Sequence, residues 1–209
     1  MDQWLPRQSY ESREGTIRYD VFGEGPPLVL VHGTPFSSYV WHKIIPALSS
    51  RWTVFVYDLL GYGASEKRVG QDVSLAAQTN ILADLLDHWA LKAPHVAGHD
   101  FGGAIVLRAH LLKAQDFARI ALLDPVALSP WGSGSHLHVR SHLDAYETMP
   151  ERFHRAIVSA YIREATHRGL DEMALEPYLA AHGGFLHLLR RLELARLARV
   201  LPRDEIELA

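Results

Sequence analysis

Two glycine-bounded turns in the sequence could carry nucleophilic chemistry, and the first is Gly98-His99-Asp100-Phe101-Gly102-Gly103. An apolar run ends at this turn and a helical pattern follows it, so Asp100 stands where a strand passes sharply into a helix. The glycines let neighbouring backbone pack close to a strained residue. An ionised carboxylate is a nucleophile without an activating base. Asp100 is therefore a candidate nucleophile, although an aspartate before a helix is also a common N-cap.

The second turn, His32-Gly33-Thr34-Pro35, follows the apolar run Leu28-Val29-Leu30-Val31. Two such turns at one end of a parallel sheet form a site, because ligands bind outside the carboxyl ends of the strands. The backbone amide of Phe101 opens the helix after Asp100 and points where negative charge can be stabilised. Phe101 is therefore expected to contribute to an oxyanion hole.

Strand and helix patterns alternate before these turns and after them, which predicts an α/β fold with a doubly wound, mostly parallel sheet and helices on both faces. Strands are expected at 27–31, at 53–57, from Val96 up to the turn at Asp100, and at 120–123, with an antiparallel edge hairpin over 8–23. Helices are expected at 39–48, at 74–90 (N-cap Ser74) and from the turn at Asp100 to about Lys113. After Asp124 the pattern predicts a polar loop over 129–142 and helices at about 143–166, 171–181 and 184–199. The expected division is a core over 1–128 and an all-helical cap region over 129–209.

Composition limits the partners. The 209 residues carry a formal net charge of −3, so neither nucleic acid nor a membrane surface is expected as a partner. The sequence has no cysteine, and a cytoplasmic location is expected. No cofactor is expected. His136, His138 and His142 form the tightest histidine group, but no carboxylate-rich motif accompanies them, so a solvated loop is expected there and no metal site.

Three motifs in register carry a resemblance to a known family: His32-Gly33-Thr34-Pro35, Asp58 with Gly61-Tyr62-Gly63-Ala64-Ser65, and the turn around Asp100. Together they resemble the α/β-hydrolase superfamily, and the aspartate in place of serine is similar to the branch of epoxide hydrolases, haloalkane dehalogenases and fluoroacetate dehalogenases. The resemblance implies that Asp100 attacks an sp³ carbon, opening an epoxide or displacing a halide, to form an alkyl-enzyme ester. A histidine-activated water would hydrolyse the ester, with the oxyanion held by the amides of Thr34 and Phe101.

The resemblance also suggests residues around this centre. Asp124 lies where one group of haloalkane dehalogenases places the carboxylate that orients the histidine, or it starts a turn before Pro125. His32 either contacts substrate or serves loop geometry, as Asp58 and Ser65 are expected to do. Substrate-binding candidates in the cap, over a small apolar substrate, are Trp131, Tyr146 and Tyr161. These two tyrosines and Tyr178 are candidates to donate to an epoxide oxygen, as paired cap tyrosines do in epoxide hydrolases, whereas any single one can also be a packing residue.

Two departures from the family pattern keep a second hypothesis open. Haloalkane dehalogenases usually carry tryptophan after the nucleophile and often asparagine after His-Gly as halide donors, where this sequence has Phe101 and Thr34. The family continues past the cap with two strands and a catalytic histidine that find no match before Ala209. The alternative to an enzyme is a catalytically impaired hydrolase remnant that acts as a binding or interaction module. An exposed sheet edge would favour a homo-oligomer.

Overall fold

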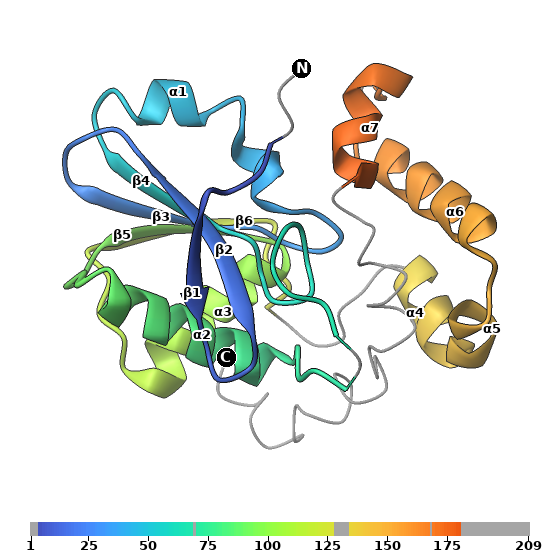
Figure 1. Cartoon of the computed structure of the whole chain (residues 1–209), viewed down its shortest axis with the longest axis horizontal. Coiled ribbons are helices and arrows are strands. Elements are labelled where there is room, and N and C mark those ends of the chain that lie inside the picture. Colours follow the sequence, from blue (N-terminus) through green and yellow to red (C-terminus); the bar gives the residue numbers. More distant parts are fainter. Residues whose placement is uncertain (1–3, 69, 128–133, 168, 181–209) are drawn as a thin grey trace.

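A six-stranded sheet is the centre of the computed structural model, which describes residues 4–68, 70–127, 134–167 and 169–180 (Figure 1). The strands lie in the order β1-β2-β4-β3-β5-β6. Their bounds are β1 Gln8–Glu11, β2 Thr16–Phe22, β3 Pro27–Val31, β4 Thr53–Tyr57, β5 His95–His99 and β6 Arg119–Leu123. The predicted fold class, α/β with a mostly parallel sheet, is confirmed.

The strand order brings the two glycine-bounded turns together. β3 pairs in parallel with β4 on one side, where Val31 faces Tyr57, and with β5 on the other, where Val31 faces Gly98. The chain leaves β3 towards β4 and later returns to the opposite side of β3, so the direction of winding reverses at this strand. The crevice at such a reversal is where open α/β sheets bind their ligands. The turns after β3 and β5 both open there.

Helices cover both faces of the sheet, as predicted. α2 (Leu75–His88) and α3 (Phe101–Lys113) bury apolar side chains such as Leu82, Leu85 and Ile105 against one face. Ser74 is the N-cap of α2, accepting from the amide of Ala77 as its position predicted. The other face packs against the short helices that follow β3, through Trp41 and Ile45.

The expected helix over 39–48 is wrong: the segment forms a 3-10 helix, η1 (Ser38–Trp41), and a separate short helix, α1 (Ile45–Leu48). Pro46 is the reason, because proline lacks an N–H and its ring clashes with the carbonyl four residues earlier, so it is accepted only in a first helical turn.

The cap region also differs from the expectation. The polar loop predicted over 129–142 contains a helix, α4 (Gly134–Ser141), although its glycine and serine content favoured a loop. The helix expected over 143–166 is divided at Pro150 into α5 (Leu143–Glu147) and α6 (Glu151–Glu164). α7 (Glu172–Ala180) matches the expected 171–181, and the helix expected over 184–199 lies outside the described residues.

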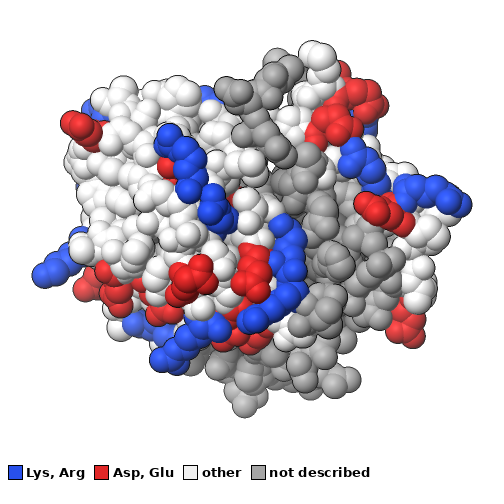
Figure 2. Space-filling view, in the orientation of Figure 1, with Lys and Arg blue, Asp and Glu red and all other residues white. Residues whose placement is uncertain are grey.

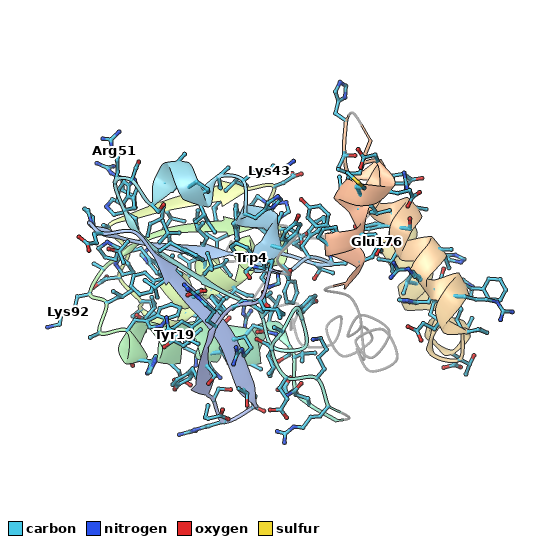
Figure 3. All side chains as sticks on the ribbon, turned by 45° about the horizontal axis from the view of Figure 1, so that its top comes forward. Trp4, Tyr19, Lys43, Arg51, Lys92 and Glu176 are labelled. Carbon is cyan, nitrogen blue, oxygen red and sulfur yellow. The ribbon has the colours of Figure 1, made fainter. Side chains whose placement is uncertain are left out.

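The cap helices α6 and α7 form their own small core beside the sheet (Figure 1). Its buried residues are Val158 and Ile162 from α6 and Leu175 and Leu179 from α7. Phe36, from the loop after β3, packs against the same cluster and so joins the core to the cap helices. On the outside, Glu176, labelled in Figure 3, accepts a 2.7 Å hydrogen bond from Arg155 of α6.

Acidic and basic side chains are interspersed over the face in Figure 2, in keeping with the small net charge. Among the helices that the structure describes, none combines the length and the apolar character that crossing a bilayer requires.

Candidate active site

Asp100 stands at a strained turn between β5 and α3. Its backbone has φ 53° and ψ −118°, a conformation that non-glycine residues rarely adopt. Neighbouring backbone holds it there: the Asp100 amide donates to the carbonyl of Leu123 at 3.0 Å, and its carbonyl accepts from Gly103 at 3.0 Å. A β-carbon at Gly102 would lie 2.3 Å from the carbonyl oxygen of Val31, so only glycine allows β3 to approach this closely.

Two backbone amides hold the Asp100 carboxylate. The Thr34 amide donates to Oδ1 at 2.8 Å, and the Phe101 amide, at the start of α3, is also hydrogen-bonded to the carboxylate. Burial raises the pKa of Asp100 above its ordinary value and the negative charge of Asp124 adds to the rise, while the two amides and His99 oppose it. The site therefore holds a partly desolvated carboxylate whose Oδ1 has a fixed donor.

The other end of Thr34 is also fixed. Its hydroxyl oxygen lies 2.8 Å from the phenol oxygen of Tyr62, which comes from the loop after β4 and is buried. Sequence reasoning treated that loop as scaffolding and did not single out Tyr62. The motif Gly61-Tyr62-Gly63 marked the loop, but the path of the chain that brings Tyr62 to Thr34 is not visible in a linear pattern.

His32 is completely buried, and backbone groups occupy both of its ring nitrogens. Nε2 accepts from the amide of Leu59 at 2.9 Å, so the proton is on Nδ1, which donates to the carbonyl of Gly33 at 3.0 Å. Burial lowers the pKa of His32, which favours this neutral form. The imidazole thus connects the loops after β3 and β4.

Asp58 also connects the loops after β3 and β4. Its carboxylate accepts from the amide of Ser38 and from that of Ala64, each at 2.7 Å, and Ser65 donates to its carbonyl. Trp4, labelled in Figure 3, adds a hydrogen bond from Nε1 to the hydroxyl of Ser38. Each buried carboxylate oxygen is thus satisfied, as a buried charge requires.

Asp124 directly follows β6, with φ 49°, and its side chain is exposed. Its charge acts on Asp100, as described above, so the two carboxylates are near one another. His99 precedes the nucleophile candidate and lies between the rings of Phe36 and Trp41, at 6.0 and 6.3 Å. Its Nδ1 is buried, with no hydrogen-bond partner among the described residues.

The cap candidates are spread over three places. Trp131 lies outside the described residues. Tyr146 on α5 is half-buried beside His138, and Tyr161 on α6 is 40% exposed. Tyr178 on α7 reaches the core, with its ring 5.8 Å from that of Phe36 and 5.0 Å from that of Tyr39.

No group of three or more potential metal ligands comes together within the part of the chain that the structure describes. The ring of His138 on α4 is 4.4 Å from that of His142, the residue before α5, and no carboxylate among the described residues completes a site with them.

Comparisons with known proteins agree with this geometry. The family model described as "alpha/beta hydrolase fold" matches residues 26–155. A soluble epoxide hydrolase from Corynebacterium sp. (strain C12) is 39% identical over 110 residues, covering 53% of this chain and 38% of that protein. A fluoroacetate dehalogenase from Burkholderia sp. is 32% identical over 128 residues, covering 59% of this chain and 42% of that protein. The chain spans about two fifths of the length of these curated relatives.

A solved structure extends the similarity beyond the residues that the family model matches. An alpha/beta hydrolase fold protein from Burkholderia ambifaria superimposes with a TM-score of 0.87 at 40% identity, covering 98% of this chain and 74% of that one. The match spans the sheet, both glycine-bounded turns and the cap helices. With the strand order, the turn at Asp100 and the family model in agreement, the chain belongs to the α/β-hydrolase fold family.

Proposed function

We propose that this chain is a hydrolase in which Asp100 attacks an sp³ carbon of an epoxide or a carbon–halogen bond. The observation that supports this most is the carboxylate at the strained turn, with one oxygen held by the Thr34 amide at 2.8 Å. A serine in this place would need a base to become nucleophilic, whereas a carboxylate does not. The relatives named above as an epoxide hydrolase and a fluoroacetate dehalogenase favour the same class of reaction.

The first step forms an ester. Asp100 Oδ2 supplies the electron pair for a new C–O bond, and the bond from carbon to the epoxide oxygen or halide breaks with its electron pair leaving on that atom. An opened epoxide takes up a proton, and we place Tyr178 as its donor because this tyrosine of the cap reaches the core loops.

The second step hydrolyses the ester. Water attacks the carbonyl carbon of the esterified Asp100, and the negative charge develops on Oδ1, where the amides of Thr34 and Phe101 stabilise it. The proton of the water passes to a histidine, which Asp124 would orient. Collapse of the tetrahedral intermediate breaks the bond between its carbon and Oδ2, and the departing alkoxide takes the proton held by the histidine and leaves as the alcohol or diol. The remaining carboxyl proton returns to Tyr178 after epoxide opening, or passes to solvent after halide loss, which restores the carboxylate.

The surroundings of Asp100 favour a small apolar epoxide over an unactivated haloalkane. The side chain of Phe101 offers no hydrogen-bond donor to a departing halide, and it is buried in the apolar core. Phe36 and Tyr178 present apolar ring surface where the cap meets the core, which suits an apolar substrate.

Covalent labelling tests the proposal directly. The full chain is incubated with styrene oxide and its intact mass is measured, followed by peptide mapping of any adduct. We expect one label per chain on Asp100, none on Asp100→Asn, and unchanged labelling in the control variant Asp116→Asn, which removes an exposed carboxylate after α3.

The time course separates the two steps. A stoichiometric burst with a lasting ester on Asp100 indicates that ester formation works and hydrolysis does not, and continuous diol release indicates that both work. Absence of label and of turnover with styrene oxide, a haloalkane and a haloacid would contradict the assignment and favour the binding-module hypothesis.

A further inference from the structure

We infer that Tyr62 is a positioning residue for the nucleophile: its hydroxyl fixes Thr34, and thereby fixes the Thr34 amide on Oδ1 of Asp100. The inference rests on the proposed function for its catalytic meaning. Its structural content, that Tyr62 acts on Asp100 through Thr34, is testable without turnover.

The two hydrogen bonds share one residue. Thr34 is bonded at its hydroxyl to Tyr62, 2.8 Å away, and at its amide to Asp100, also 2.8 Å away. Both bonds lie on the turn after β3, which the bond from the Phe36 amide to the carbonyl of Gly33 closes, and the Thr34 hydroxyl joins this turn to Tyr62 of the loop after β4. Removing the hydroxyl contact therefore loosens the turn that presents the Thr34 amide to Asp100.

The direction of the Tyr62–Thr34 bond follows from burial. Tyr62 is only 5% exposed, and Thr34 is the hydrogen-bond partner that the structure gives its hydroxyl. If Thr34 donated, the phenol hydrogen would be buried without an acceptor, which is costly. A phenol is also the stronger donor of the two. Tyr62 therefore donates to Thr34.

Tyr62 is itself rigidly held, as a positioning residue must be. Its amide donates to the carbonyl of Leu59 at 2.9 Å, and its carbonyl accepts from Ser65 at 3.0 Å. Its ring meets the imidazole of His32 edge-on, with 5.7 Å between ring centroids. His32 in turn accepts from the same Leu59 and donates to Gly33, the residue before Thr34.

These contacts connect the loop after β4 to the turn that holds the nucleophile. Tyr62 reaches Thr34 through its hydroxyl and Gly33 through His32, so the turn that carries the Thr34 amide is held at two adjacent residues. Asp100 Oδ1 is then fixed and Oδ2 is left to attack. Sub-ångström placement of this kind is what reaction rates respond to.

The experiment compares Tyr62→Phe, which keeps the ring and removes the hydroxyl, with Tyr57→Phe as a matched control. Tyr57 ends β4, is also completely buried, and has a hydroxyl with no partner among the described residues. The first readout is the titration of Asp100, followed by carbon-13 NMR of the aspartate carboxyl groups and assigned with Asp100→Asn. The second is the rate of styrene oxide labelling across pH.

We expect Tyr62→Phe to raise the pKa of Asp100 by roughly half a unit or more, since the hydrogen bond that stabilises its charged form loosens. Labelling should slow about tenfold at neutral pH, with the pH profile displaced upwards by the same shift. Thr34→Val, which removes the acceptor, should reproduce both effects. Thr34→Ser, which keeps the hydroxyl, should titrate and label as the wild type does. Tyr57→Phe should leave both unchanged.

The outcomes separate this inference from the proposed function. If Tyr62→Phe and Thr34→Val fold but titrate and label as the wild type does, Tyr62 does not position Asp100, and the proposed function stands. If the wild type is never labelled, the proposed function fails, and the NMR titration still decides whether Tyr62 acts on Asp100. A shift in Tyr57→Phe equal to that in Tyr62→Phe would mean a general effect of losing a buried hydroxyl and would overturn the inference.

Discussion

Substituting Gly33 by alanine is the sharpest test of how closely the two turns must approach. A β-carbon at position 33 would lie 2.4 Å from Cβ and 2.5 Å from Oδ1 of Asp100. Ordinary van der Waals contact begins at 3.4 Å, so the turns must separate by about 1 Å. The Thr34 amide follows Gly33 directly and would move away from Oδ1 with it.

The expected loss is large in rate and moderate in stability. A displacement of about 1 Å in a reacting group costs on the order of 100-fold in rate. Overpacking of this kind lowers the free energy of unfolding by roughly 1–3 kcal/mol, so most of the protein stays folded. The assay is the rate of styrene oxide labelling at Asp100, with urea unfolding of the same samples.

The matched control is Gly134→Ala at the start of α4, where an added β-carbon meets nothing within 4 Å. It should label at the wild-type rate. Labelling of folded Gly33→Ala within about twofold of the wild type would refute the reasoning, because it would show that a 1 Å displacement of the Thr34 amide does not matter.

Four further predictions follow from the same contacts. Because burial raises the pKa of Asp100, its neutral form stabilises the fold at low pH and that contribution is lost as pH rises through the folded-state pKa; Asp100→Asn should therefore raise the free energy of unfolding at neutral pH and leave it unchanged at about pH 3 in urea titrations. The lowered pKa of His32 has the opposite sign, so stability should fall as pH drops below the ordinary histidine range, and His32→Gln should flatten that dependence. Phe36→Ala should speed amide hydrogen exchange in α7 but not in α3, at a cost of about 1–3 kcal/mol for a half-buried ring. Styrene oxide should label Asp100 faster than 1-bromobutane does, and equal or faster labelling by the bromide would contradict the role given to Phe101.

The sequence was most informative where burial and local chemistry act on neighbouring residues. The apolar runs that end at Val31 and Gly98 predicted parallel strands, and the glycines of the turn at Asp100 predicted close packing that the structure shows. Ser74 was predicted as an N-cap from its place before a helical pattern. These signals are local, so a linear reading contains them.

Other features depend on the path of the chain between distant residues. The contact between Thr34 and Tyr62 joins residues 28 positions apart, and nothing in either motif indicates that their hydroxyls meet. Tyr178 was one of three cap tyrosines with equal claims until the structure placed it against Phe36. Pro46 stands in the middle of the helix expected over 39–48, but the apolar residues around it recur at helical spacing and so predicted one continuous helix.

The packing of Phe36 has a consequence for anyone who wishes to exchange the cap between related proteins. The side chain belongs by contact to the cluster of Val158, Ile162, Leu175 and Leu179, yet it is encoded more than a hundred residues before them. A chimera joined at the end of β6 would transfer the four cap residues and leave Phe36, their partner from the core, behind. Recombination sites chosen by sequence alone would thus cut through a packed unit, and a successful exchange should carry residue 36 from the same parent as α6 and α7.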